Sequence, residues 1–455
     1  MSLVKPKFPG IFEPIQLGVG ARGGSERAVH IVQTALETMG ENTVLLKTDI
    51  RNAFNSRRRD QMLQTLFDHP ELAPVWRIAH WAYSSSSSLL VFEKGKYKTT
   101  IKSAQGVKQG DVLGSFLYAL SIHPAYQQCT PPGDDKVRKV AIMDDLNLVG
   151  AFKPVLEAFD RFEASLVDTG LEMRRDKCRI LWPHPTPIPE DLQYEAEKRQ
   201  IKIETGAMTT LGAMVGLDQE KIMNWVAEKV AKHKKLFDIL QHAEMPSQIS
   251  ALLLRMSALP SMGYLSRTIR PHLLADYAKK FDLMVLETAV SKLNLPKALS
   301  EETVSTLHLP LRLGGFGLRS VAKTSSAAYF SAVAQTVPDL LAIVPANHVN
   351  SLLVEEKSRI PTANAIQSCL EFFAASGLTL GQAGLPRNLA EFWGNYSLPT
   401  PGSRLQSAVC TLLESVALAK LKAQLDLHNQ QRIVSAGGKF AGVWLSVTLL
   451  PSISN

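Results

Sequence analysis

Two adjacent aspartates, Asp144 and Asp145, interrupt an otherwise apolar stretch, VRKVAIMDDLNLVG, and constrain the fold more than any other feature of this sequence. The apolar halves on either side have the length and composition of short buried strands. Acids between two such strands predict a β-hairpin that carries its carboxylates at the tip. A second short apolar run, TVLLKTDI, reads as a buried strand that ends at Asp49.

Carboxylates that come from separate strands can converge on a pair of divalent ions, as two-metal phosphoryl transfer requires. Mg²⁺ is usually held by only one or two carboxylates together with phosphate, so Asp49 and the Asp pair are enough for such a site. Neighbouring strand residues point to opposite faces of a sheet. We therefore expect one of Asp144 and Asp145 to face Asp49 and bind both ions, and the other to contribute less. A second pair, Asp134-Asp135, lies in a Pro-Gly loop and is expected to be a solvated turn.

Irregularly alternating strand and helix signals around these acids predict an α+β class with a mainly antiparallel sheet. Residues 1–24 read as a loop, and Ser25 is a candidate N-cap for a helix over 26–39. The segments SLLVFEK and KYKTTIKS flank Gly95 and predict a hairpin. Prolines at 185, 187 and 189 suggest a soft boundary. After about residue 217 the pattern becomes largely helical, beginning with a helix over 219–242.

Charge and cysteine usage restrict the class of protein further. The 455 residues carry a formal charge of +8 with a pI near 9.2, which favours an acidic partner such as nucleic acid. Four scattered cysteines suggest neither a zinc module nor a disulfide framework, so a reducing compartment is expected. No apolar run is long enough to span a membrane or to form a signal peptide. We expect an intracellular protein with no membrane partner; nucleus or cytoplasm, and the oligomeric state, stay open.

Four short patterns around the acids occur in a specific order: DIRNAFNS, QGVKQGDVLGS, IMDDLNLVG and GLEMRRDKC. This ordered set resembles motifs A to D of the reverse transcriptases of non-LTR retrotransposons. The segments QLGVGARGGSERAVH, TTLGAMVG, LLLRMSALPSMGYLSRT and LPLRLGGFGLRS also look like that lineage. The resemblance covers about residues 15–330. It implies an RNA-directed DNA polymerase that adds dNTPs to a DNA primer on an RNA template, with Mg²⁺ or Mn²⁺ as cofactor.

The resemblance also implies a fold: a polymerase palm, which is a ferredoxin-like antiparallel sheet with helices, followed by an all-helical thumb and a C-terminal helical region. The expected domains are a fingers remnant at 1–40, the palm at 41–217, the thumb at 218–300 and a helical region of unknown role at 301–455.

Roles carry over from the family to matching positions of this chain. Asp49 and Asp144, with Asp145 beside them, would be the metal ligands. Phe54 would be the aromatic gate that excludes a 2′-hydroxyl, with a core aromatic as the alternative interpretation. Further residues would contact the substrates: Gln109 and Gly110 beside the nucleotide and templating base, Lys177 near the triphosphate, Gly212 in the primer grip (Leu211–Gly216), and Lys229, Lys232, Lys234 and Lys235 along the duplex. The alternative for Lys177 is a solvated lysine, and the alternative for the primer grip is a plain β-hairpin. For the four lysines along the duplex it is a solvated helix face. The triplet Arg57-Arg58-Arg59 is likewise either a backbone contact or a solvated helix start.

The sequence also departs from the family pattern. Ile142 replaces an aromatic before the Asp pair, Val112 replaces a proline after QGD, and Asn55 stands where many relatives have Asp. The larger departure is at the start, where the basic fingers region is reduced to Lys5, Lys7, Arg22 and Arg27. On this ground the alternative to a polymerase is a truncated, non-catalytic nucleic-acid-binding relic. A viral RNA-dependent RNA polymerase is disfavoured by Met143, where those enzymes usually have Gly, and by Phe54.

Overall fold

The computed structural model describes residues 2–108, 110–344, 360–394, 404–438 and 441. The chain divides into two compact units, Met1–Asp218 with Pro338–Pro345 and Gln219–Val337 with Ala346–Asn455. Among the described residues, no helix is both long and apolar enough to cross a membrane.

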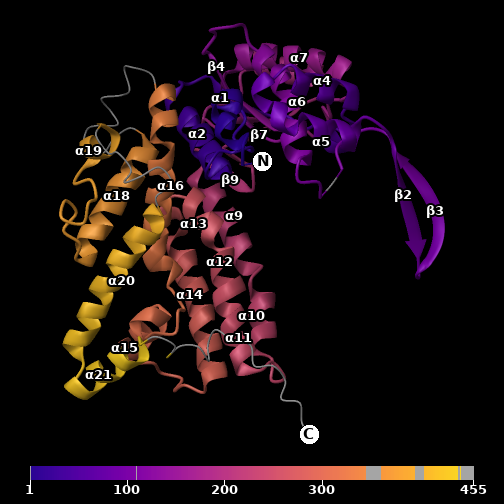
Figure 1. The fold of residues 1–455 in the computed structure, drawn as a ribbon. Coiled ribbons are helices and arrows are strands. Elements are labelled where there is room, and N and C mark those ends of the chain that lie inside the picture. The colour runs from indigo at the N-terminus through magenta and orange to yellow at the C-terminus, as the bar shows by residue number, and fades with distance from the viewer. Residues whose placement is uncertain (1, 109, 345–359, 395–403, 439–440, 442–455) are drawn as a thin grey trace. The chain divides into compact units, whose positions relative to one another are not determined.

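The first unit is built on a five-stranded sheet with strand order β4-β5-β1-β6-β7 (Figure 1). The strands are β1 Thr43–Lys47, β4 Val137–Ile142, β5 Asp145–Ala151, β6 Arg179–Trp182 and β7 Lys202–Thr205. All neighbouring pairs are antiparallel except β6 and β7, which run parallel. The predicted α+β class with a mainly antiparallel sheet is therefore confirmed.

Both faces of this sheet are covered, because consecutive side chains of its central strand point to opposite sides and the first four of its five residues are buried. Val44 and Leu46 join one core cluster with apolar residues of helices α6 (Gly114–Gln128) and α7 (Phe152–Leu166). Leu45 points the other way. Helix α2 (Gly24–Thr38) also packs on β1, β4 and β5 and lies outside that cluster, so it covers the opposite face. Burial on both sides explains why the three middle residues of β1, Val44–Leu46, are all apolar.

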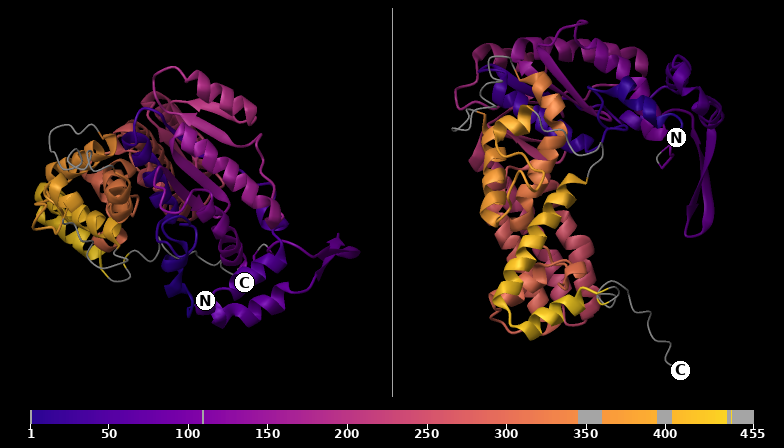
Figure 2. Two further views of the ribbon diagram at one scale, coloured as in Figure 1. Left: turned by 90° about the horizontal axis from the view of Figure 1, so that it is seen from above. Right: turned by 60° about the vertical axis from the view of Figure 1, so that its left-hand side comes forward.

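The remaining elements of the first unit flank this sheet. A hairpin of β2 (Ser87–Glu93) and β3 (Lys96–Ser103) projects from it in every view, with large apolar side chains such as Phe92 and Tyr97 exposed (Figures 1 and 2). The other elements are η1 Lys5–Lys7, α1 Phe8–Phe12, α3 Ala53–Ser56, α4 Arg59–Phe67, η2 Pro70–Leu72, α5 Ala73–Tyr83, η3 Val167–Thr169, α8 Glu190–Lys198, β8 Ala207–Thr210 and β9 Ala213–Gly216.

Three local predictions were wrong. Residues 1–24 are not only loop, because Phe8 and Phe12 are buried in α1 and pack edge to face at 5.7 Å. Helix α2 begins at Gly24, after Gly23 in a left-handed conformation, so Ser25 lies inside the helix and is not its cap. The prolines at 185–189 mark no boundary, since α8 and β7 follow them and β7 completes the sheet.

The second unit is helical throughout its described part. The predicted helix over 219–242 is interrupted, so that α9 (Gln219–Ala231) and α10 (Lys234–Gln241) are separate. The other elements are α11 Ser247–Leu253, the π-helical turn η4 Leu254–Ala258, α12 Leu259–Ser261, α13 Gly263–Thr268, α14 Pro271–Leu293, α15 Glu301–His308, η5 Leu311–Leu313, α16 Val321–Ile343, α18 Pro361–Ser376, α19 Leu389–Gly394, α20 Leu405–Gln424 and α21 Leu427–Ala436.

A buried carboxylate joins helices α14 and α16. Asp282, in the middle of α14, accepts hydrogen bonds from the backbone N–H of Val321 (2.8 Å) and Ala322 (3.1 Å) and from Ser320 Oγ (2.6 Å). These donors lie at the N-terminus of α16, where the helix dipole also favours a negative charge. Asp282 therefore caps α16 from a neighbouring helix.

Candidate active site

Asp49 follows the central strand and is held by the strands and turns on both sides of it. Strand β1 ends at Lys47, two residues before the acid. The observed strand is therefore shorter than the predicted one, which ended at Asp49. On one side, the N–H of Thr48 donates to Leu146 O of β5 (3.0 Å). On the other, Asp49 O accepts from the N–H of Arg174 (2.8 Å). The backbone of Asp49 is thus fixed between β5 and the segment that resembles motif D.

Asp144 and Asp145 lie at the tip of the β4–β5 hairpin, as predicted. Asp145 is the first residue of β5 and pairs with Ile142, so Met143 and Asp144 form the two-residue turn. Met143 has a φ of +56°, the left-handed conformation that a two-residue hairpin turn demands. Since β5 lies next to β1, the hairpin tip and Asp49 are at the same end of two adjacent strands.

A buried glutamine that the sequence interpretation did not single out holds this turn. Gln16 accepts from the N–H of Met143 (2.9 Å) and donates through Nε2 to Met143 O (2.9 Å). Tyr126 donates its hydroxyl to the same carbonyl at 2.7 Å. A Cβ on Gly18 would come within 2.8 Å of Gln16 Oε1, so glycine leaves room for the clamp. The only signal in the sequence is that Gln16 opens the family-like segment QLGVGARGG.

The acids share one electrostatic environment. The pKa of Asp144 is raised, first by burial and then by the charges of Asp145 and Asp49. Burial also raises the pKa of Asp145, where the charge of Lys47 acts in the opposite direction and that of Asp49 in the same direction. Asp49 therefore acts on both members of the pair, and which of them faces it more directly stays a prediction.

Carboxylates crowded at a partly buried hairpin tip suit a divalent cation, because its charge would relieve their mutual repulsion. The oxygen donors are those that Mg²⁺ and Mn²⁺ prefer. Within the described part of the chain, however, no three Asp, Glu, His or Cys side chains are gathered closely enough to hold one ion. One or two carboxylates with phosphate oxygens and water can hold Mg²⁺, so the residues present fit a metal bound together with a substrate.

The segments that resemble motifs A and B are joined through their backbones. The N–H of Gly106 donates to Arg57 O and that of Val107 to Phe54 O, both at 2.8 Å. Gly106 has a φ of +68°, and a Cβ there would lie 2.4 Å from the carbonyl oxygen of Asn55. Only glycine allows this close approach. The contact fixes the QGVKQGD loop against the residues that follow Asp49.

The arginine triplet is mainly structural, which corrects the interpretation of it as a surface feature. Arg57 is buried and donates to Ser121 O (2.7 Å) and Thr169 O (2.8 Å), and burial lowers its pKa to about 10. Arg59 is also buried and donates to Gly106 O and Ser103 O, both at 2.8 Å. Arg58 alone is exposed. Arg57 and Arg59 thus hold together the elements around the acids.

Phe54 follows Asp49 by five residues and stacks on a buried tyrosine. Its ring is 4.3 Å from that of Tyr118, with an interplanar angle of 17°. Burial and then the charge of Asp144 raise the pKa of Tyr118 well above its usual range. Tyr118 therefore connects Phe54 to the acids, although the sequence interpretation did not select it. Phe54 is half-buried, as both interpretations of this residue allow.

The structure gives less information about the other predicted nucleotide contacts, Gln109, Gly110 and Lys177. Gln109 lies outside the described residues. Gly110 is exposed, has a φ of +86°, and has open space where a Cβ would project. Lys177 is exposed, and its N–H donates to Arg174 O (2.9 Å) in the turn next to Asp49. These positions are compatible with the expected roles, which stay predictions.

The predicted primer grip is a tight hairpin of β8 and β9. Leu211 and Gly212 form its turn, and both have positive φ angles. The hairpin is anchored at both ends, because Thr210 Oγ1 donates to Asn147 Oδ1 (2.7 Å) and Gln33 exchanges two hydrogen bonds of 3.0 Å with the backbone of Gly216. Asn147 is a buried residue of β5, so the hairpin is tied to the strand that begins at Asp145.

The predicted duplex contacts lie on helices of the second unit. Lys229 Nζ is 5.0 Å from the centre of the Trp225 ring. This cation–π contact within the helix already engages the ammonium group of Lys229. Lys232, Lys234 and Lys235 are exposed where α9 gives way to α10. In the first unit, Lys5, Lys7 and Arg22 are exposed, whereas Arg27 is ion-paired with Glu13 and Asp339.

Comparison with known proteins shows which proteins this chain is similar to. Residues 6–212 match the family model described as reverse transcriptase (RNA-dependent DNA polymerase). The chain is 24% identical over 332 residues to the retrotransposable element SLACS 132 kDa protein of Trypanosoma brucei gambiense, covering 72% of this chain and 26% of that protein. It is also 24% identical over 285 residues to the Pol polyprotein of the type-1 retrotransposable element R2 of Nasonia vitripennis, covering 59% and 26%. The chain thus spans about a quarter of the length of these relatives.

Among solved structures, apo telomerase from Candida tropicalis is similar at a TM-score of 0.37 and 10% identity, covering 96% of this chain and 60% of that one. The site does not depend on this weak likeness. Proteins of the matched family depend on divalent metal ions, which agrees with the carboxylates at the hairpin tip. Residues 6–212 of this chain are a reverse transcriptase domain, an RNA-directed DNA polymerase domain of the kind found in non-LTR retrotransposons.

Proposed function

We propose that this chain extends a DNA primer on an RNA template, with Asp49, Asp144 and Asp145 as its catalytic acids. The primer 3′-hydroxyl attacks the α-phosphorus of the incoming dNTP, a phosphodiester bond forms, and pyrophosphate leaves. The carboxylates would hold Mg²⁺ or Mn²⁺, which when bound supplies charge neutralisation for the triphosphate and lowers the pKa of the attacking hydroxyl. The observation that carries the proposal is that Asp49 and the Asp pair lie at the same end of two adjacent strands, β1 and β5.

The other residues would position the substrates. Phe54, braced by Tyr118, would lie under the sugar of the incoming nucleotide and leave no room for a 2′-hydroxyl. Gln109 and Gly110 would border the nucleotide and the templating base, and Lys177 would lie near the triphosphate. Gly212 would allow the primer backbone to approach the β8–β9 turn closely.

We also propose the domain assignment as a fingers remnant at 1–40, a palm at 41–217, a thumb at 218–300 and a helical region at 301–455. In the thumb, Lys229, Lys232, Lys234 and Lys235 would bind phosphates of the template–primer duplex. Such contacts would give an affinity that does not depend on sequence and falls with salt.

Primer extension with purified full chain tests the proposal. The assay supplies an RNA template, a DNA primer and dNTPs with Mg²⁺ or Mn²⁺, and compares the wild type with Asp144→Asn. The matched control is Asp135→Asn, which makes the same change in the exposed Asp134-Asp135 loop. We expect Asp144→Asn to lose at least about a hundredfold in rate, since it removes charge needed in the transition state, and Asp135→Asn to match the wild type.

Two results would contradict the proposal: no extension by the wild type under any of these conditions, or equal extension by wild type and Asp144→Asn. Binding of the template–primer without extension would instead identify the chain as a non-catalytic relic.

A further inference from the structure

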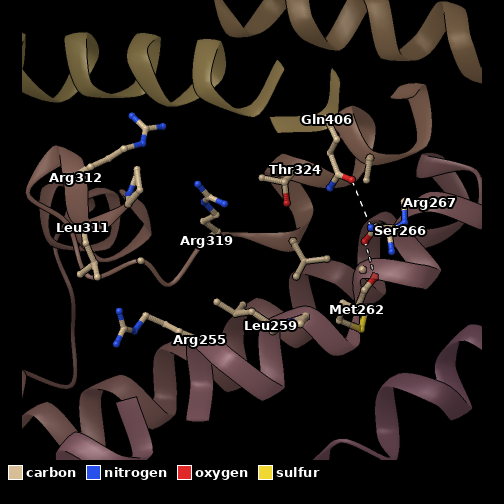
Figure 3. Close-up of a pocket in the computed structure, with 16 residues that line it drawn as sticks. Arg255, Leu259, Met262, Ser266, Arg267, Leu311, Arg312, Arg319, Thr324 and Gln406 are labelled. Carbon is tan, nitrogen blue, oxygen red and sulfur yellow. Dashed lines mark hydrogen bonds between the residues drawn. The ribbon is translucent and has the colours of Figure 1, made fainter. Parts of the chain in front are cut away.

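A cavity in the second unit brings together two family-like segments that have no part in the proposed catalytic site. The cavity has a volume of about 660 Å³. Its lining comes from residues 255–267, from residues 310–328 and from Gln406 of α20 (Figure 3). The first two stretches contain most of the segments LLLRMSALPSMGYLSRT and LPLRLGGFGLRS. All of the lining residues belong to the second unit.

The cavity is strongly basic. Four arginines line it, namely Arg255, Arg267, Arg312 and Arg319, and none of its described lining residues is acidic. Figure 3 shows the guanidinium groups of Arg255, Arg312 and Arg319 toward one end of the view and Arg267 at the other, where it donates to Gln406 Oε1 (3.5 Å). Several guanidinium groups around one space are an arrangement suited to phosphate, whose oxygens match the planar donor geometry of arginine.

One carboxylate outside the cavity offsets only part of this charge. The largely buried Glu414 accepts a hydrogen bond from Arg312 Nη2, and Arg319 Nε lies 2.8 Å from its other oxygen. The contact with Arg319 is close in distance but is not aligned as a hydrogen bond. Two cations therefore share one anion, and both side chains stay about half exposed. Glu414 orients these arginines and leaves the cavity with an excess of positive charge.

Arg255 supplies a second, independent observation that points to an anionic ligand. Its Nη2 atom is buried and has no hydrogen-bond partner among the described residues. A buried donor left without an acceptor is unfavourable, and a bound anion would satisfy it. Arg255 lies in the π-helical turn Leu254–Ala258, an irregularity that is frequent at functional sites. Gly317, with a φ of +71°, lies against it, since a Cβ there would be 3.1 Å from Arg255 Cδ.

We propose that this cavity binds phosphate groups of a nucleic-acid strand through Arg255, Arg312 and Arg319. Its apolar lining, which includes Leu259 and Met262, would lie against sugars or bases. The proposal goes beyond the reverse transcriptase domain at 6–212 and rests on the proposed function only for the choice of nucleic acid as the ligand. Phosphate groups could also come from a free nucleotide, which the experiment distinguishes.

The test measures the binding of two probes to the full chain by fluorescence anisotropy: a labelled single-stranded oligouridine and a labelled ribonucleoside triphosphate. EDTA is present throughout, so that metal-dependent binding at the aspartates does not contribute. The variant is Arg255→Gln with Arg319→Gln. The matched control is Arg387→Gln with Arg432→Gln, which removes the same charge from exposed positions of the same unit that do not line the cavity.

We expect the cavity variant to bind oligouridine at least about tenfold more weakly than the control variant, because it has fewer charge-assisted hydrogen bonds to phosphate. Its salt dependence should become shallower by about 0.7 in log–log slope for each phosphate that the variant no longer neutralises. A selective loss of triphosphate binding would assign the phosphates to a nucleotide instead. Equal affinity of the cavity and control variants for both probes would overturn the proposal.

A gentler variant covers the case in which the double substitution unfolds the unit. Gln406→Glu keeps the size of the side chain and places a negative charge beside Arg267. It should weaken oligouridine binding several-fold while the thermal unfolding midpoint stays unchanged, and unchanged binding would again contradict the site. Because EDTA removes the metal from the aspartates, a failure of primer extension would leave this binding test intact. The cavity and the catalytic acids can therefore fail independently.

Discussion

Gln16 holds the peptide groups on both sides of Met143: its side chain accepts from the N–H and donates to the carbonyl of that residue, each at 2.9 Å. The two residues are 127 positions apart in the sequence. Because Met143 and Asp144 form the turn of the β4–β5 hairpin, this contact holds the backbone from which the Asp144 carboxylate projects. We class Gln16 as a positioning residue.

Replacement of Gln16 by Met tests this role. The change keeps the bulk but removes two hydrogen bonds to buried groups, so we expect a loss of about 1–3 kcal/mol in unfolding free energy. Extension should slow by roughly tenfold to a hundredfold, since small misplacement of reacting groups is costly, with little change in the KM for dNTP. Gln128→Met, at an exposed position of α6, is the control. A stability loss without a fall in kcat at a temperature where the variant is folded would contradict positioning.

A smaller residue at position 54 should relax the choice of sugar. Phe54→Val leaves space above Tyr118 where a 2′-hydroxyl could fit, so the preference for dNTP over rNTP should fall by roughly tenfold or more, a change of about 1–3 kcal/mol in discrimination. The measurement is the ratio of kcat/KM for the two substrates. Phe67→Val changes an exposed phenylalanine of α4 and should keep the ratio. An unchanged ratio in Phe54→Val would mean that Phe54 is only a core aromatic.

The adjacent residues Arg58 and Arg59 should contribute very differently to the free energy of unfolding. Arg59→Met removes the donors to Gly106 O and Ser103 O and should destabilise the first unit by about 2–4 kcal/mol, because it leaves buried acceptors unsatisfied. Arg58→Met loses an exposed ion pair with Asp60 and should change stability by less than about 1 kcal/mol. Chemical denaturation followed by circular dichroism compares them. Equal effects of the two changes would contradict the structural assignment of Arg59.

Buried His123 should make the fold sensitive to acid. Burial, with the nearby charges of His69 and Lys139, lowers its pKa to about 4, from about 6.5 in the unfolded chain. Between these values the unfolded state binds more protons, so stability is complete above about pH 6.5 and falls as the pH drops toward 4. At pH 5 the loss is about 2 kcal/mol.

The variant His123→Gln should lose less stability between pH 7 and pH 5 than the wild type does. Exposed His80→Gln is the control and should keep the wild-type slope. The measurement is the unfolding midpoint in denaturant at each pH. An identical slope in wild type and His123→Gln would show that His123 is not responsible.

Features that depend on short stretches of chain could be predicted from the sequence. The β4–β5 and β2–β3 hairpins and the fold class follow from apolar runs, turn residues and alternation, and these signals are local. The positions of Asp49, Asp144 and Asp145 at strand ends follow in the same way. Element boundaries were less certain. The prolines at 185–189 read as a boundary only because the pairing of β7 with β6 is invisible in the local sequence.

By itself, then, the sequence determined the class of fold, the ordered motifs and the three aspartates that we propose as catalytic acids. Only the tertiary structure decided that Arg57 and Arg59 point inward, that Gln16 clamps Met143, and that Arg255 and Arg319 meet at one cavity. An arginine or glutamine has the same local sequence pattern whether it is solvated or buried. Its role depends on which distant carbonyls and carboxylates the folded chain brings within hydrogen-bonding distance, because a buried donor must find an acceptor there.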